Sequence, residues 1–391
     1  MKTKLLLLGL FFGISVGFSH SFLLKYVINI GPIPINFIDL IFFILFFNFF
    51  ISFKNIIINK KCLAFICALI FLSFISLTIG LNNNDDIHLI IRDFRYIFYF
   101  LFMILIVNSH INSMEDLKKV NNIIFIFSGI GTLQIYIYAL SNTTTLKTLT
   151  SPITASIIFL SYLFILYKDK AINRLNFSIL LLFGIGASLL TMVRNIWLCC
   201  LIIIIINFIT MVKRNKKGLF GLLFFILCIY FIFSSDINVL LNAKIYYTFN
   251  NFYSDTLYFR VFDAKQLLNY ILYNNLLLFG AGFGAVAPIY SLGISGTLQL
   301  VLSYYTENSY LFYLWKMGVA SLIILIFMFI FQTINYLRVK RDITIINFRW
   351  LFIIYILILS FSGGISQVEQ IFYFSLLCGL DIKKVSSKCI N

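Results

Sequence analysis

The stretch Tyr305–Thr333, YTENSYLFYLWKMGVASLIILIFMFIFQT, combines a long apolar run with two charged residues. A run of about 20 apolar residues is long enough for a helix that crosses a bilayer. Glu307 precedes this run and Lys316 lies inside it. In a straight helix Lys316 would lie about 13.5 Å beyond Glu307 and on the opposite face. The two charges therefore cannot pair there, and Lys316 needs a cavity or a partner on a neighbouring helix.

The whole chain has the composition of an integral membrane protein. Of its 391 residues, 61% are hydrophobic and 11% are charged, and the mean hydropathy is +0.99. Soluble domains carry about 25% charged residues. The formal net charge of +16 comes from short basic clusters between apolar runs. This pattern indicates membrane topology, and no nucleic acid is expected as a partner.

The apolar runs predict an all-α integral membrane protein with about 12 transmembrane helices. The N-terminal run is similar to a secretory signal, but further spans follow it, so we interpret it as an uncleaved first helix. The predicted spans lie near 4–23, 35–53, 62–80, 93–109, 121–140, 152–168, 177–193, 195–212, 218–235, 308–333, 347–363 and 365–381.

Basic residues orient these spans. With the N-terminus in the cytoplasm, every predicted inner segment contains a basic cluster, as the positive-inside tendency requires. Both termini are then cytoplasmic. The basic residues outside the inner segments are Lys25, Arg92, Arg95, Lys147, Arg194, Lys244, Arg260, Lys265 and Lys316.

This topology divides the chain into three parts. Residues 1–234 contain helices 1–9, residues 235–306 form one large external loop, and residues 307–391 contain helices 10–12 and a short cytoplasmic tail. Long loops with structure of their own are usually functional. The glycine-rich half of this loop, LLLFGAGFGAVAPIYSLGISG, can dip into the bilayer against protein. The preceding half can form an amphipathic helix on the membrane surface, with a buried side made of Phe262, Leu267, Leu268 and Ile271.

Two arginines on the outer side are candidates for binding an anion. Arg194 lies between two long apolar runs with almost no loop around it. Facing lipid near the bilayer centre it would cost about 2.5–3.5 kcal/mol. It either reaches the membrane interface or lies in a water-filled cavity, where its fork of donors suits phosphate. Arg260 in the external loop is either a solvated residue paired with Asp263 or part of such a site.

Arg92 and Arg95 stand at the external start of the predicted fourth span. Their three-residue spacing places them on one helical face, and Asp93 can neutralise part of their charge. The alternative role is anchoring at the membrane interface, beside Tyr96 and Tyr99.

The segment TENS predicts a helix start, with Thr306 as N-cap and Glu307 in the first turn, where the helix dipole favours an anion. Capping alone would explain Glu307. The segment GAGFGA has nucleotide-loop spacing, but it lies outside the membrane and opens no βαβ unit, so a tight backbone turn is expected instead. The seven cysteines and three histidines show no metal-ligand spacing, so neither a disulfide framework nor a metal site is predicted.

The order of these features is informative. Arg194 lies in a minimal external turn, Arg260 follows in the large loop, and LLLFGAGFGA and ENSYLFYLWKMGV come next. This order resembles the bacterial O-antigen polymerase and O-antigen ligase superfamily of polytopic glycosyltransferases. The resemblance covers about residues 185–335 by motif and the whole chain by topology. It implies a GT-C-like fold in the bacterial inner membrane, with the large loop in the periplasm.

The resemblance further implies a metal-independent, inverting glycosyltransferase without a cofactor. It would join oligosaccharide repeat units linked to undecaprenyl diphosphate, with Arg194 and Arg260 on the diphosphate and Glu307 and Asn308 as catalytic residues. The expected partners are the lipid-linked glycans that serve as donor and acceptor, the lipid bilayer and, as a candidate, a chain-length regulator protein. Further candidate substrate contacts are Arg92, Arg95, Tyr310 and Lys316.

Two alternatives remain open. An O-antigen ligase would transfer the finished chain to lipid A core, but ligases carry His where this chain has Glu307. A lipid-linked oligosaccharide flippase would need basic residues within many helices and has no need of a large external loop. Both comparisons favour the polymerase.

Overall fold

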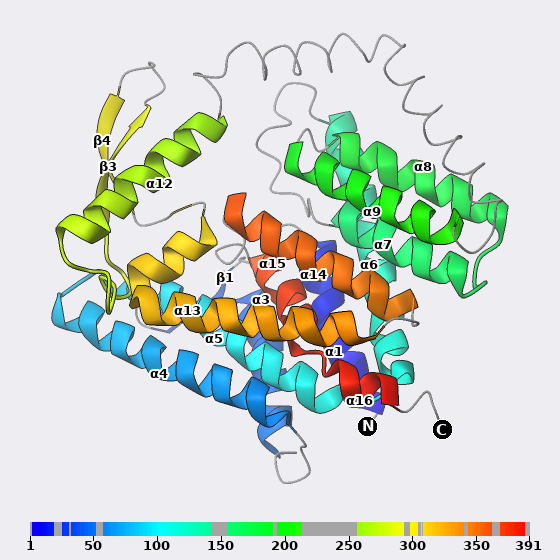
Figure 1. Ribbon diagram of the computed structural model, residues 1–391, viewed down its shortest axis with the longest axis horizontal. Helices are drawn as coiled ribbons and strands as arrows, with labels where there is room; N and C mark the ends of the chain where they lie inside the picture. The colour runs from blue at the N-terminus through cyan, green and yellow to red at the C-terminus, as the bar shows by residue number, and fades with distance from the viewer. Residues whose placement is uncertain are drawn as a thin grey trace.

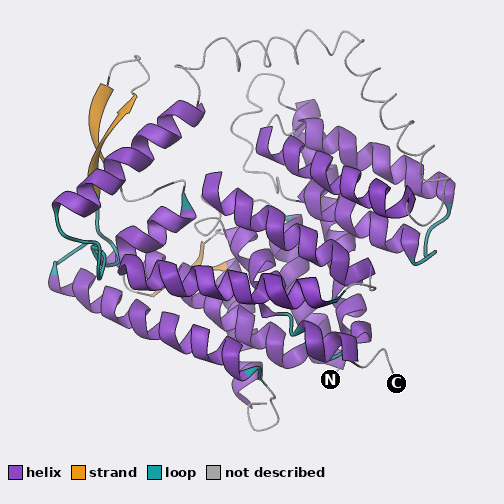
Figure 2. Cartoon of the chain, viewed as in Figure 1, coloured by secondary structure: helices purple, strands orange, loops and turns teal. Residues whose placement is uncertain are grey.

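The computed structural model describes residues 2–18, 26–30, 33–51, 58–141, 155–190, 194–212, 256–292, 298–303, 306, 308–339, 343–361 and 368–387. Helices predominate in these ranges, and two short β-hairpins accompany them (Figure 2). The predicted helical class is thus confirmed, whereas the hairpins were not predicted.

Apart from α12 (Thr256–Tyr273) and α16 (Ile382–Ser387), the helices follow the predicted apolar runs, and Figure 1 shows how they are arranged. The predicted ninth span, 218–235, lies outside the described residues. The helices are α1 (Lys2–Gly17), α3 (Phe37–Ile51), α4 (Lys60–Asn82), α5 (Ile87–His110), α6 (Met114–Ser141), α7 (Ala155–Lys168), α8 (Arg174–Leu190), α9 (Arg194–Val212), α12 (Thr256–Tyr273), α13 (Ser309–Arg338), α14 (Ile343–Phe361), α15 (Val368–Gly379) and α16 (Ile382–Ser387).

Within the described ranges, three helices are long and apolar enough to cross a bilayer by length and composition. They are α4, the Met114–Ile137 part of α6, and α13. Shorter apolar helices, among them α3 and α7, accompany them. The structure therefore indicates a membrane protein, and twelve spans with both ends in the cytoplasm stay a prediction.

Both hairpins are antiparallel and lie in predicted external segments. Strand β1 (Tyr26–Ile30) pairs with β2 (Ile33–Asn36), and β3 (Ala287–Leu292) pairs with β4 (Leu298–Ser303). In β3, buried and exposed side chains alternate along the strand; for example, Ala287 is buried and Tyr290 is exposed. This period of two is the pattern of a strand with one covered face.

The predicted amphipathic helix exists as α12, but protein covers its buried side. Leu267 and Ile271 are buried in one apolar cluster with Trp315 of α13. Phe262 is half-buried. Leu268 is 38% exposed and is not covered by protein. The contact of this side with the membrane surface stays a prediction.

The helices fall into two neighbouring groups. In Figure 1, α4, α5 and α13 lie alongside one another, and α7, α8 and α9 gather at the opposite side. Helix α5 also packs along α15, and α1 packs along α6. The candidate site described below lies in the first group, where α4, α5 and α13 meet.

Glycines at four-residue spacing let α1 approach α6. Gly9, Gly13 and Gly17 face α6, where a Cβ at Gly9 would lie 2.6 Å from Ile123 Cδ1. A Cβ at Gly13 would lie 2.5 Å from Phe127 Cδ2. Small residues at this spacing allow close contact between membrane helices. The first helix is therefore a packed part of the protein.

We expect Gly13→Ala to lower the free energy of unfolding by about 1–3 kcal/mol, the usual cost of overpacking. The matched control is Gly129→Ala on α6, because a Cβ there meets its nearest atom at an ordinary 3.5 Å. Thermal unfolding of the two variants in the same detergent measures the difference. Equal stability would contradict the described packing of α1 on α6.

Candidate functional site

A buried carboxylate, Asp93, joins α5 to two other segments. Helix α5 starts with Asp86 as N-cap, whose side chain accepts a hydrogen bond from His88 N, and Asp93 lies on the buried face two turns later. Its Oδ1 accepts from Arg92 Nη2 at 3.0 Å. Its Oδ2 lies 3.0 Å from Lys316 Nζ and accepts from Gly284 N at 3.1 Å.

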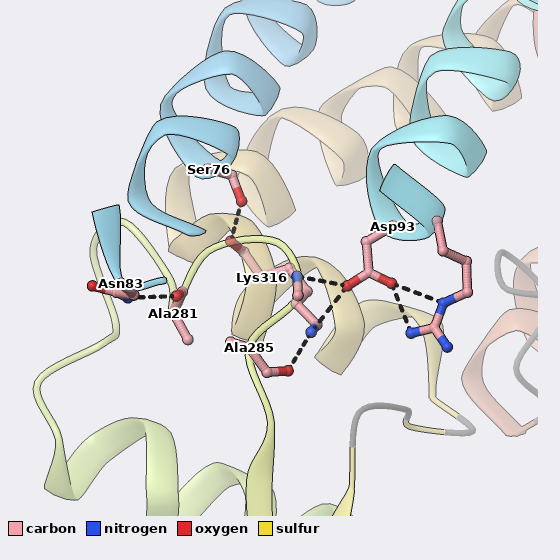
Figure 3. A network of polar contacts seen from close by, with 8 residues as sticks. Ser76, Asn83, Asp93, Ala281, Ala285 and Lys316 are labelled. Carbon is pink, nitrogen blue, oxygen red and sulfur yellow. Dashed lines mark hydrogen bonds and ion pairs between the residues drawn. The ribbon is translucent and has the colours of Figure 1, made fainter. Parts of the chain in front are cut away.

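Lys316 is fully buried and its ammonium is enclosed by protein groups (Figure 3). Besides pairing with Asp93, the ammonium donates to Ala285 O at 2.6 Å. It also lies 4.1 Å from the ring centroid of Trp315, at a distance typical of a cation–π contact. Of the two predicted possibilities for Lys316, a cavity or a partner on a neighbouring helix, the structure shows the second, and the partner is Asp93 of α5.

Helix α13 breaks directly after Lys316. Gly318 has φ 77° and ψ 178°, outside the helical region. The hydroxyl of Ser321 donates to Tyr313 O at 3.2 Å, although the two residues are eight apart. Eight residues of straight helix would separate them by about 12 Å. The segment Ser309–Met317 therefore folds back as a separate half-helix.

The glycine-rich segment fills this break. Ala281 N donates to Trp315 O at 2.7 Å, and Gly282 N donates to Lys316 O at 3.2 Å. Val319 N in turn donates to Leu277 O at 2.8 Å. These bonds satisfy backbone groups that the broken helix leaves without helical partners. The Gly-rich segment and α13 thus form one hydrogen-bonded unit.

Two glycines of this turn are required by geometry. Gly280 and Gly282 have φ of 76° and 90°, which side chains disfavour. A Cβ at Gly280 would lie 2.5 Å from the carbonyl carbon of Lys316, and one at Gly282 would lie 2.6 Å from Gly80 N of α4. The predicted tight backbone turn is confirmed, and its cause is close packing against α4 and α13.

Hydrogen bonds from α4 hold the other side of the turn (Figure 3). The hydroxyl of Ser76 donates to Lys316 O, and Phe283 N donates to Ser76 O at 3.1 Å. Asn83 Nδ2 reaches Ala281 O at 3.4 Å. Three helices therefore converge on one loop.

The second predicted arginine of α5 belongs to a different carboxylate. Arg95 Nη1 lies 3.2 Å from Asp39 Oδ2, and Asp39 also accepts from the Tyr99 hydroxyl and from Asn36 N. Arg92 and Arg95 share a helical face as predicted, yet they serve separate pairs. Asp39 was not predicted as a site residue, although an isolated acid in an apolar run is a usable signal.

The start of α13 differs from the prediction. The N-cap is Asn308, whose Oδ1 accepts from Tyr310 N at 3.0 Å and from Leu311 N at 3.1 Å. Thr306, the predicted cap, instead accepts a hydrogen bond from Asn308 N at 3.3 Å. The Tyr310 hydroxyl donates to Ile356 O of α14. An amide at the cap position replaces the hydroxyl because Asn308 directly precedes the first helical residue.

The remaining predicted site residues are only partly placed. Arg194 is the first residue of α9 and Arg260 lies in the second turn of α12, but their side chains are outside what the structure describes. Glu307 lies outside the described residues altogether. The structure thus brings Lys316 and Arg92 together on Asp93, and it places Asn308 and Tyr310 at the far end of the same half-helix as Lys316.

No group of three or more His, Cys, Asp or Glu residues in the described ranges is arranged to hold a metal ion. Comparison with known proteins adds no assignment, since no protein-family model, curated protein or solved structure matches the chain. The family resemblance therefore stays a prediction.

Asp85, in the turn between α4 and α5, offers a test of the local electrostatics. Its Oδ2 is buried without a hydrogen-bond partner. Burial raises the pKa of this carboxyl, the Lys316 ammonium lowers it and Asp93 raises it, with a net upward shift. The folded protein then binds this proton more tightly than the unfolded chain, so ionised Asp85 costs stability at neutral pH.

We expect Asp85→Asn to raise the thermal stability at pH 7. The gain should shrink as the pH falls through the raised pKa and vanish below the ordinary value of 3.8, because both states are then protonated. Thermal unfolding of both proteins across this pH range measures the effect. A loss of stability at pH 7 would show that Asp85 is a stabilising counter-ion of Lys316.

Proposed function

We propose that the protein is an O-antigen polymerase that joins undecaprenyl-diphosphate-linked repeat units at the periplasmic face of the bacterial inner membrane. The observation that supports this best is the joining of two motifs of the resemblance. LLLFGAGFGA and NSYLFYLWKMG come in succession in the sequence, and here they form one hydrogen-bonded unit around the break of α13. The two motifs, which follow one another in the sequence, are thus also in direct contact.

In the proposed reaction a hydroxyl of one lipid-linked glycan attacks the anomeric carbon of another. The new glycosidic C–O bond forms as the bond to the diphosphate breaks, and the diphosphate leaves with the electron pair. Glu307 takes the proton of the acceptor hydroxyl. Arg194 and Arg260 stabilise the charge that develops on the leaving diphosphate. A single displacement of this kind inverts the anomeric carbon.

The capping hydrogen bonds of Asn308 limit which of its side-chain atoms could contact the reacting groups. Its side-chain oxygen is committed to the backbone N–H groups of Tyr310 and Leu311. An orienting contact to Glu307 or to a sugar hydroxyl would therefore come from its amide NH₂, which is a donor. Asn308 would then hold the helix start and the reacting group together.

Two other candidate substrate contacts, Arg92 and Lys316, differ in how far their side chains are exposed. The Lys316 side chain is fully buried, whereas 30% of the Arg92 side chain is exposed. If Arg92 turns toward an anion, Asp93 keeps the Lys316 ammonium and the Gly284 N–H. A buried carboxylate left without any partner would be costly, and this arrangement avoids that cost. Arg92 is therefore a better candidate than Lys316 for a diphosphate contact.

We expect Arg194→Ala and Arg260→Ala each to reduce polymerisation by about 100-fold or more, the usual effect of removing a donor that stabilises transition-state charge. The matched control is Lys265→Ala, which removes an exposed basic residue of the same helix as Arg260. The readout is the polysaccharide ladder in cells at equal protein level. A full-length ladder in both arginine variants would contradict the diphosphate role.

Deletion of the gene separates this function from ligation. Single repeat units on lipid A core are the expected result, because ligation continues without polymerisation. Bare core would instead contradict the polymerase and favour one of the two alternatives, a ligase or a flippase.

We expect Glu307→Gln to abolish elongation in a protein that still folds, because the amide cannot accept the proton. Size-exclusion chromatography checks the fold, and the ladder measures chain length. Unchanged chain length would reduce Glu307 to a residue of the helix start.

A further inference from the structure

The half-helix Ser309–Met317 is a separate segment of α13. The break at Gly318 separates it from the long second half. Its interior residues are buried against several neighbours, with Trp315 in the cluster of α12 and Tyr313 in the main core. Asn308, at its start, belongs to the proposed reaction site, so whatever fixes this half-helix also fixes that residue.

One charged contact ties the half-helix to α5. Lys316 is the only charged residue within Ser309–Met317, and its partner Asp93 comes from a different helix and also binds Gly284 N. A single carboxylate thus contacts the half-helix and the glycine-rich turn that fills the break. Apolar packing has no fixed direction, whereas this pair has a defined geometry.

We propose that Lys316 and Asp93 are positioning residues whose ion pair holds the half-helix Ser309–Met317, and with it Asn308, at the site. Neither residue has to touch substrate. The role of Asn308 rests on the proposed function, whereas the positioning of the half-helix does not. The two are therefore tested by separate measurements.

The first measurement is hydrogen exchange of the full-length protein in lipid nanodiscs. In Lys316→Met, amides of Leu277–Ala285 and of Asn308–Phe312 should exchange about tenfold faster or more, because their hydrogen bonds open when the half-helix is released. Lys168→Met is the matched control, since the Lys168 ammonium donates to the side chains of Asn207 and Thr210 in α9 rather than to the half-helix or the glycine-rich turn. That variant should leave both segments unchanged.

A second variant covers the case in which Lys316→Met does not fold. Asp93→Asn keeps the shape and an oxygen for Gly284 N while removing the charge. The double variant should exchange no faster than the faster single variant, because both changes remove one interaction. Wild-type exchange at Asn308–Phe312 in the folded variants would overturn the proposal. Equal acceleration throughout the chain, including α7–α9, would also overturn it.

The second measurement is elongation kinetics with lipid-linked repeat units. A positioning role predicts that kcat falls by about tenfold or more while KM for the acceptor stays within about twofold. A change in KM alone would overturn the role at the site. If exchange changes as expected but the wild-type protein elongates no glycan, the proposed function fails and the positioning of the half-helix stands.

Discussion

A fully buried ammonium, that of Lys316, can persist in this fold because Asp93 lies 3.0 Å from it. Removing an ion from water costs several kcal/mol even after the protein relaxes, and only a well-placed opposite charge with further hydrogen bonds offsets that cost. Ala285 O and the Trp315 ring complete the shell of the ammonium. Gly284 N donates to the same carboxylate oxygen as Lys316, and Arg92 binds the other oxygen. The pair is therefore stable only if α5, α13 and the glycine-rich turn keep their places.

The same constraint explains the glycines. A helix that breaks in an apolar environment exposes carbonyl and N–H groups that neither lipid nor apolar side chains can satisfy. Here the backbone of the turn supplies the missing partners at Trp315, Lys316 and Val319. The approach is close enough that a Cβ at Gly280 would overlap the α13 backbone. The hydrogen bonds to the broken backbone of α13 and the Lys316–Asp93 pair thus favour the same conformation of the glycine-rich turn.

This arrangement also suits the proposed chemistry. Reactions that develop negative charge gain most from donors held in place before the reaction, and a site on helices is held more rigidly than one on loops. Helix α13 begins directly after its N-cap Asn308, and the turn and the ion pair anchor it at Trp315 and Lys316. Arg92, whose side chain is 30% exposed, binds Oδ1 of Asp93, whereas Lys316 contacts Oδ2. Buried charges that serve the fold and a charge accessible to an anion therefore share one carboxylate.

The helices could be predicted from the sequence, because the period and length of apolar runs are local properties and lipid requires each segment to satisfy its own backbone. The sequence also predicted that Lys316 needs a cavity or a partner and that GAGFGA forms a tight turn. Asn308 rather than Thr306 caps α13, which is a local difference within the segment TENS. Only the packed structure shows that the partner of Lys316 is Asp93 and that Arg95 pairs with Asp39. It also decided the two hairpins and the protein-covered side of α12. The two ion pairs join residues far apart in the chain, and no local pattern encodes which buried charges will meet once the helices have packed.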